Sequence, residues 1–477
     1  MKRLKQILKI GLALVVLVII ALVSILLIDA WNTSYLKVKN HSETKRNTYI
    51  IKDVNIIPMT SDTVLTNTSI KIVHGKIEQI GKHIDTVDME VIDAKGAYLS
   101  PGLMDMHVHV WDKCELGLYL ANGVTTIRNM WGMPQHLRIK KEVEQDKLLS
   151  PVFLTSSPKL TGKEDLGDDK VQISTPEEAR QLVTEYEKRG YNFIKTYAGL
   201  PEDLEKAILE QSLIDDIPIV SHPSHEIPYL QQFHPQIKSL EHAEEIVQQA
   251  LDYHLDSIGL ETVIQKFAKT QTSFCPTLVG YYKIFEMLNQ SETIMQSEQV
   301  HYMNPLIQIS DSQVQYERWK NQKENDSSIT AYILKQHQFH KYCIKKMNEE
   351  GVNMICGTDA GIGITAPGFS IHEELALYKS AELSNYEALK TATINPTRSH
   401  QILKNVGSIE QGKLANFILT SKNPLMDLSA LKDPEWVMIK GHLIDKNLME
   451  ELKEKARDRK NLFATAIRYA EYMFIER

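Results

Sequence analysis

The sequence predicts an α/β protein: a TIM-like (β/α)8 barrel with a small split β-sandwich domain, preceded by one N-terminal transmembrane helix. Three observations support this prediction. β-like runs alternate with helical stretches through the middle of the chain, short β runs flank that region on both sides, and an uncharged apolar run lies near the N-terminus. Alternating β and α segments are typical of parallel sheets with helical crossovers, which is how a barrel is built.

The apolar run extends from Ile10 to Ile28 and follows a basic cluster, Lys2, Arg3, Lys5 and Lys9. At 1.5 Å per residue this run is roughly 28 Å long, which matches the hydrocarbon core of a bilayer. A cleaved signal peptide is the alternative, but its apolar region is usually shorter and ends in an Ala-x-Ala-like site. We therefore expect residues 1–30 to be an uncleaved single-pass anchor in the cell membrane, with a cytoplasmic N-terminus and the remaining chain outside the cytoplasm.

The remaining chain divides into segments of different character. Residues 31–47 are polar and are expected to form a linker, whereas residues 48–99 and 403–447 contain short β runs and are expected to form one composite β-sandwich. The barrel is expected over residues 100–402, with a helical insertion at residues 281–350 over its mouth. Residues 448–477 are expected to form a C-terminal helix that packs on the protein itself, with a dimer or membrane-surface contact as alternatives.

Eight barrel strands are expected. The first contains His107 and His109, and the others lie at Val124–Met130, Val152–Ser156, Phe193–Tyr197, Pro218–His222, Ile237–His242, Ser273–Val279 and Met354–Asp359. Because successive side chains of a strand point to opposite faces, His107 and His109 emerge on the same face. Two imidazoles placed in this way form half of a metal site.

Further polar residues stand where other predicted strands end. They are Lys195, His222, His242 and Asp359, on the expected strands 4, 5, 6 and 8. Catalytic groups of barrel enzymes come from these carboxyl ends. Each residue alone has an ordinary structural explanation, such as a surface histidine or a helix cap. Their occurrence together at strand ends favours a single site.

Bulk properties exclude some functions. The net charge is −7 over 477 residues, with 43% hydrophobic and 24% charged residues, which is ordinary for a globular protein. No basic stripe is available to bind phosphates, so nucleic acid is not expected as a partner. The cysteines are scattered and are expected to be free rather than disulfide-bonded: Cys114, Cys275, Cys343 and Cys356.

The motifs resemble those of a known superfamily. The string Pro101-Gly102-Leu103-Met104-Asp105-Met106-His107-Val108-His109, together with Gly357-Thr358-Asp359-Ala360-Gly361, is similar to the signatures of the amidohydrolase superfamily, in its imidazolonepropionase and prolidase-like (Xaa-Pro dipeptidase-like) branch. The resemblance covers roughly residues 48–445. One departure is Ala415-Asn416, where the family usually has Ala-Asp, and it lies outside the metal site.

The resemblance implies a site with two divalent ions, most readily Zn²⁺. His107, His109 and Asp359 would hold the more buried ion, and His222 and His242 the other. Lys195 would carry carbon dioxide as a carbamate and bridge both ions. A lysine near other cations has a lowered pKa and can be neutral and nucleophilic. Imidazole and carboxylate ligands with open positions suit a catalytic zinc site, although Mn²⁺, Co²⁺ and Fe²⁺ remain open.

The resemblance also implies a reaction. A water between two cations is acidified, and Asp359 accepts its proton and later returns it to the leaving nitrogen. Tyr197 is a candidate for stabilising the oxyanion, with plain packing as the alternative. Arg128 is a candidate for binding a substrate carboxylate, but a structural ion pair is the favoured interpretation.

The sequence therefore predicts a membrane-anchored, metal-dependent amidohydrolase that hydrolyses a dipeptide or an N-acyl amino acid. A hydrolase of cyclic amides or a deaminase, with one metal ion on the same fold, is a second interpretation. A non-catalytic barrel that serves as a surface scaffold is a third. Homo-oligomerisation remains open.

Overall fold

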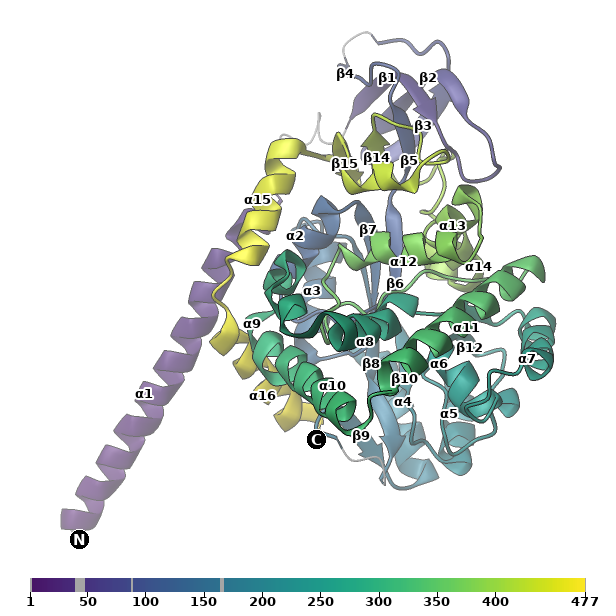
Figure 1. Ribbon diagram of the computed structural model, residues 1–477. Helices are drawn as coiled ribbons and strands as arrows, with labels where there is room; N and C mark the ends of the chain where they lie inside the picture. Colours follow the sequence, from purple (N-terminus) through teal and green to yellow (C-terminus); the bar gives the residue numbers. More distant parts are fainter. Residues whose placement is uncertain (1, 39–47, 87–88, 164–166, 477) are drawn as a thin grey trace.

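The computed structural model describes residues 2–38, 48–86, 89–163 and 167–476, and its centre is a parallel barrel (Figure 1). Seven strands follow one another around the barrel and all pair in parallel. They are β6 (Leu103–Val108), β7 (Val124–Asn129), β8 (Val152–Gly162), β10 (Phe193–Thr196), β11 (Ile219–Ser221), β12 (Ile237–Glu241) and β13 (Ser273–Cys275), and β9 (Lys170–Ile173) extends the sheet beside β8. The predicted barrel is confirmed.

The expected eighth strand, Met354–Asp359, differs from the prediction. This segment is held by single parallel bridges, from Met354 to Phe274 and from Ala360 to Val108. It still closes the barrel between β13 and β6. The seventh strand is also shorter than predicted and ends at Cys275, because α8 (Leu278–Gln290) begins three residues later.

Helices surround the barrel and bury their apolar faces against it. They are α2 (Cys114–Ala121), α3 (Pro134–Glu144), α4 (Pro176–Arg189), α5 (Glu202–Ile214), α6 (Ala243–Glu245), α7 (Ser257–Thr270), α12 (Ser370–Ser380), α13 (Asn385–Thr391) and α14 (Asn395–Ser399). The start of α4 shows why a helix begins where it does. The side chain of Thr175 accepts a hydrogen bond from the backbone N of Glu178, and Pro176 occupies the first helical turn. Met104, Phe193 and Val220 fill the barrel interior.

The flanking domain is one mixed sheet of eight strands. Its order is β16–β15–β14–β5–β1–β2–β3, with β4 paired to β1. The strands are β1 (Tyr49–Ile56), β2 (Leu65–Val73), β3 (Lys76–Gly81), β4 (Glu90–Asp93), β5 (Tyr98–Pro101), β14 (Phe417–Thr420), β15 (Trp436–Ile439) and β16 (His442–Asp445). Because β5 pairs with both β1 and β14, it joins the two distant parts of the chain. Figure 1 shows these early and late strands in one body.

The segment between residues 281 and 350 is helical, as expected. It contains the end of α8, η5 (Ser291–Gln296), η6 (Glu298–Tyr302), α9 (Pro305–Ile307), η7 (Gln308–Ser312), α10 (Gln313–Asn325) and α11 (Ile329–Glu349). Ile307 and Asp311 from this segment line a cleft together with Tyr197, which follows β10. The insertion therefore forms part of the barrel mouth.

The C-terminal region forms two helices, α15 (Lys446–Arg457) and α16 (Leu462–Glu476). Both pack on the protein itself. Leu452 of α15 is fully buried, and the ring of Tyr472 in α16 lies 5.5 Å from that of Trp131. The last helix thus contacts the side of the barrel mouth.

Helix α1 (Lys2–Asn32) extends away from the rest of the molecule (Figure 1). It is long and apolar enough to cross a bilayer, and its apolar side chains are exposed. Its last turn is docked, because the buried Asp29 forms an ion pair with Arg468 of α16. The expected linker starts with a packed segment, since Leu36 of η1 (Ser34–Leu36) is fully buried. Residues 39–47 of that linker lie outside the described residues.

Candidate metal centre

Three residues at the carboxyl end of the barrel converge on one point. Nε2 of His107 lies 3.3 Å, and Nε2 of His109 2.9 Å, from Oδ1 of Asp359. His107 belongs to β6, His109 follows it, and Asp359 lies on the segment that closes the barrel. In the sequence, His109 and Asp359 are 250 positions apart. The fold therefore brings together the trio that the first-strand motif and Asp359 predicted.

The closing segment reaches this point because small residues let it approach β6. A Cβ atom on Gly357 would lie 2.4 Å from Sγ of Cys275, and one on Gly361 would lie 1.9 Å from the carbonyl oxygen of His109. Gly361 also has a φ of +101°, which favours glycine. Asp105 fixes the same segment by accepting hydrogen bonds from the backbone N and Oγ1 of Thr358, at 3.1 and 2.6 Å.

Two more histidines complete the cluster. His222 follows β11 and His242 follows β12, and their ring centroids are 4.6 Å apart. The ring of His242 is also 4.7 Å from that of His107. Nδ1 of His242 pairs with Oγ1 of Thr277 at 2.8 Å, which leaves Nε2 for a ligand. His242 has a φ of +71°, an uncommon backbone conformation found at many functional sites.

Lys195, in β10, is 1% exposed. Its Nζ has no hydrogen-bond partner among the described residues. Burial lowers the pKa of Lys195 to about 8. The positive charges of Arg128 and Lys159 also lower it, whereas the negative charge of Glu241 opposes the shift. An amine in this setting is neutral and nucleophilic far more often than an exposed lysine.

Buried polar atoms without protein partners are evidence for a metal site here. Nδ1 of His222 and Nζ of Lys195 are both buried and unpaired within the described residues. Unpaired buried polar atoms are rare, because each costs about 1–3 kcal/mol. Burial lowers the pKa of His107 to about 4, so its imidazole is neutral, which is the form that binds metals. The nitrogen and oxygen donors present therefore fit divalent cations.

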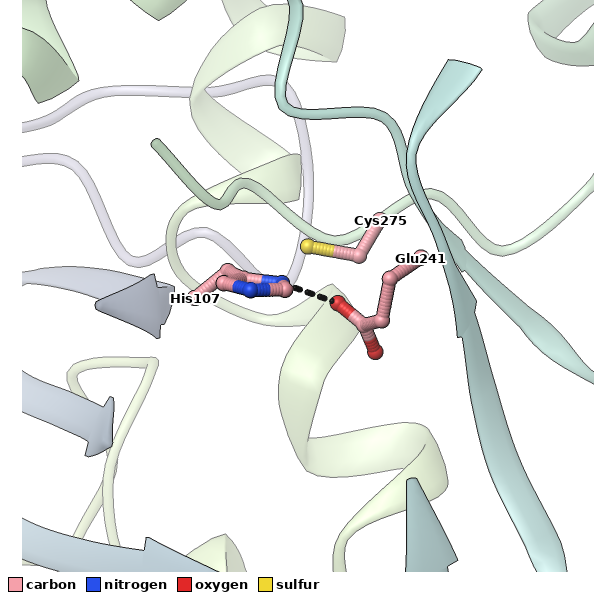
Figure 2. A group of neighbouring side chains, drawn as sticks. All are labelled: His107, Glu241 and Cys275. Carbon is pink, nitrogen blue, oxygen red and sulfur yellow. Dashed lines mark hydrogen bonds and ion pairs between the residues drawn. The ribbon is translucent and has the colours of Figure 1, made fainter. Parts of the chain in front are cut away.

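A carboxylate holds His107 in this orientation (Figure 2). Nδ1 of His107 lies 2.8 Å from Oε2 of Glu241, and both side chains are buried. Oε1 of Glu241 accepts a hydrogen bond from Arg128 at 2.8 Å. Burial alone would raise the pKa of Glu241, but Arg128 and His107 hold it well below its usual value. This support fixes the tautomer in which Nε2 of His107 faces the site.

The same network includes Arg128. Its side chain is fully buried, and it donates to the carbonyl oxygen of Met106, to Ser239 and to Glu241. Arg128 therefore cannot contact a substrate carboxylate in the cleft. The favoured interpretation, a structural ion pair, agrees with this contact.

A second carboxylate supports His222. Oε1 of Glu245 lies 3.1 Å from Nε2 of His222, and Oε2 lies 3.1 Å from Nε2 of His225. Gln249 donates to the same carboxylate at 2.5 Å. Because Nε2 of His222 faces Glu245, Nδ1 is the nitrogen that faces the cluster. Sequence reasoning missed both glutamates, although Glu241 directly precedes a predicted ligand.

The acidic member of the site is ionised. Burial raises the pKa of Asp359, but His107, His109 and His242 act more strongly and hold it well below its usual value. A carboxylate that remains charged in a buried site can bind a cation and can accept a proton.

A cleft of about 420 Å³ lies beside the site. Tyr197 lines this cleft, and its ring centroid is 4.7 Å from that of His222. Trp111, Trp131 and Tyr469 of α16 give the cleft aromatic walls. A cavity of this size suits a small molecule such as a dipeptide.

The family model for amidohydrolases matches residues 98–444. The chain belongs to the amidohydrolase family. It is thus a hydrolase that acts on carbon–nitrogen bonds.

Solved structures agree with this assignment at the level of the fold. Bottromycin amidohydrolase superposes with a TM-score of 0.72 at 19% identity, over 91% of this chain and 93% of that one. A Xaa-Pro dipeptidase with bound methionine superposes with a TM-score of 0.62 at 18% identity, over 83% of this chain and all of that one. Among curated proteins, the dihydroorotase of Pelotomaculum thermopropionicum is 54% identical over 39 residues, which is 8% of this chain and 9% of the relative. The curated relatives thus match in short stretches only.

Proposed function

We propose that this amidohydrolase holds two divalent ions, most readily Zn²⁺, and hydrolyses the amide bond of a dipeptide or an N-acyl amino acid. His107, His109 and Asp359 would hold one ion and His222 and His242 the other, with a carboxylated Lys195 between them. The observation that carries the proposal is the buried Nζ of Lys195, which has no partner in the described part of the chain, as is also true of Nδ1 of His222. A mononuclear site does not need this lysine.

Bound divalent ions would supply Lewis-acid activation of the amide carbonyl and a water acidified toward neutrality. Asp359 is placed to accept the proton of the attacking water and to donate it to the amide nitrogen as the carbon–nitrogen bond breaks. Tyr197 lines the cleft beside His222 and is placed to donate a hydrogen bond to the developing oxyanion. Glu241 and Glu245 keep His107 and His222 oriented.

We also propose that α1 anchors the protein in the cell membrane as a single span, with its N-terminus in the cytoplasm. The basic residues before the apolar run and its exposure along the helix support this placement. The catalytic domain would then lie outside the cytoplasm.

The test is to purify the full chain in detergent without chelators and to measure metal content and hydrolysis of a dipeptide and N-acyl amino acid library. About two ions per chain are expected. His107→Ala should lose both metal and activity. One ion per chain would instead favour the interpretation as a hydrolase of cyclic amides. Protein without metal and without turnover on any amide would support the scaffold interpretation.

A further inference from the structure

We propose that Lys159 binds a carboxylate of the substrate, so that the enzyme selects amides whose leaving group is an amino acid with a free carboxylate. This inference rests on the proposed function, and it names the part of the substrate that the cleft recognises. No motif in the sequence pointed to Lys159, and the proposed reaction does not use it.

The position of Lys159 in the sheet places it beside the reactive centre. Lys159 of β8 is the register partner of Lys195 of β10. Paired residues of neighbouring strands lie at the same level and face the same side of the sheet. Both residues are buried, with 7% and 1% of their surfaces exposed. A group bound by Lys159 therefore lies next to the site that Lys195 occupies.

Aromatic residues around Lys159 form one wall of the cleft. Its Nζ lies 4.5 Å from the ring centroid of Trp131 and 5.0 Å from that of Tyr197. These aromatic rings exclude water and hold the ammonium by cation–π attraction. Among the described residues that line the cleft, Lys159 is the one cation. It is the natural partner for an anionic group that enters the cleft.

Asp169 holds the ammonium of Lys159 in place but does not occupy all of its N–H donors. Its Oδ2 accepts a hydrogen bond from Nζ at 2.6 Å. An ammonium has three N–H donors, so donors remain for a substrate oxygen. Such a charge-assisted hydrogen bond is strengthened in a buried, aromatic setting.

The other acidic groups of the cleft, Asp168 and Asp311, have partners of their own. Asp168 is hydrogen-bonded to Tyr469. Asp311 accepts hydrogen bonds from the backbone N of Gly363, at 2.5 Å, and from Gln315, at 2.9 Å. These contacts tie the carboxylate to the insertion and to the loop after Asp359. Asp169 is thus the single protein carboxylate bonded to Lys159 in the described residues.

The position of the ammonium defines the substrate class. In an N-acyl amino acid, the carboxylate is separated from the amide nitrogen by only one carbon. A substrate whose carbonyl lies at the metal centre would therefore place this carboxylate close to the reacting bond, within reach of a group beside Lys195. The aromatic walls from Trp131 and Tyr197 would contact the side chain of the leaving amino acid. Amides of the same shape that lack the carboxylate should bind poorly.

The test compares three probes on the metal-loaded full chain: N-acetyl-L-phenylalanine, its neutral carboxamide, and L-phenylalanine amide, which is a cation. Affinity is taken from KM where a probe is hydrolysed and from calorimetry where it is not. We expect the wild type to bind the carboxylate about 10- to 100-fold more tightly than the carboxamide, as for one charge-assisted hydrogen bond. Lys159→Met should abolish this preference by raising KM, while kcat changes little.

Lys170→Met is the matched control. Lys170 also lies over the ring of Tyr197, at 5.2 Å, but it does not line the cleft. This variant should keep the preference for the carboxylate. A preference that survives Lys159→Met would overturn the proposal, and so would tighter binding of the cationic probe than of the carboxylate. If the carboxylate binds as expected but no amide is hydrolysed, the subsite stands and the proposed function fails.

Discussion

Glu245 lies 3.1 Å from Nε2 of His222, just as Glu241 lies 2.8 Å from Nδ1 of His107. One carboxylate thus supports a histidine of each proposed metal position. In both pairs the bond engages one ring nitrogen and leaves the other for a ligand. Supports of this kind typically contribute 10- to 100-fold to metal affinity.

The first prediction concerns Glu245. Glu245→Ala removes the acceptor that fixes the ring of His222, so the affinity for the ion held by His222 and His242 should fall by about 10- to 100-fold. Competition with a metal chelator measures this affinity directly. Glu226→Gln, which removes an exposed charge nearby, is the control and should change nothing. If Glu245→Ala resists the chelator as well as the wild type does, Glu245 does not position His222.

The second prediction concerns stability. Glu241→Gln leaves the guanidinium of the fully buried Arg128 without its ionic partner. Breaking a buried pair in this way costs about 3–5 kcal/mol. The free energy of unfolding, measured by denaturant titration of the metal-free protein, should fall by that amount. Glu450→Gln removes an exposed glutamate and should cost little.

The third prediction separates Lys195 from Asp359. Lys195→Ala should lose both metal and activity, and acetate or propionate should restore part of the rate by occupying the vacated position. Asp359→Asn keeps an oxygen ligand but accepts no proton, so turnover should drop about 10²- to 10⁴-fold while metal remains. Metal content and kcat are measured on the same preparations. Two ions and near-normal activity in Lys195→Ala would refute the carbamate.

The fourth prediction is a pH dependence. Burial lowers the pKa of Lys195 to about 8 in the metal-free protein, and only the neutral amine reacts with carbon dioxide. The neutral fraction rises with pH up to the pKa and is nearly complete above it. Reactivation of metal-free protein by Zn²⁺ under a constant pressure of carbon dioxide, which keeps the dissolved gas equal at every pH, should therefore accelerate about tenfold per pH unit below pH 8 and level off above it. A flat profile between pH 6 and 9 would contradict this mechanism.

The fifth prediction concerns α1. Trypsin added to intact cells should release the catalytic domain, and a protected domain would contradict the proposed orientation. A chain that begins at Asp29 should be soluble and active, because it keeps the ion pair with Arg468. A chain that begins at Trp31 loses this pair and should be less stable by about 1–3 kcal/mol. Thermal unfolding of the two proteins gives the difference.

Much of the fold and most of the proposed ligands could be predicted from the sequence. The barrel rule places functional side chains at strand ends, so His107, His222 and Asp359 could be found from strand patterns alone. Glu241 and Glu245 could not be found in this way, because their role depends on which ring nitrogen they face across the barrel. Lys159 escaped notice because β8 extends to Gly162, well beyond the end expected at Ser156. The eighth strand was overestimated, since Asp359 has a φ of +59° and leaves the extended conformation.

The ion pair between Asp29 and Arg468 joins the first helix of the chain to the last. The next residue, Tyr469, lines the cleft. During synthesis, α1 leaves the ribosome long before α16, so the cleft is completed only after α16 has emerged. A nascent chain that has already folded its barrel would still lack one wall of the cleft. Tyr469 therefore joins the wall of the cleft only once α16 has docked on the folded barrel.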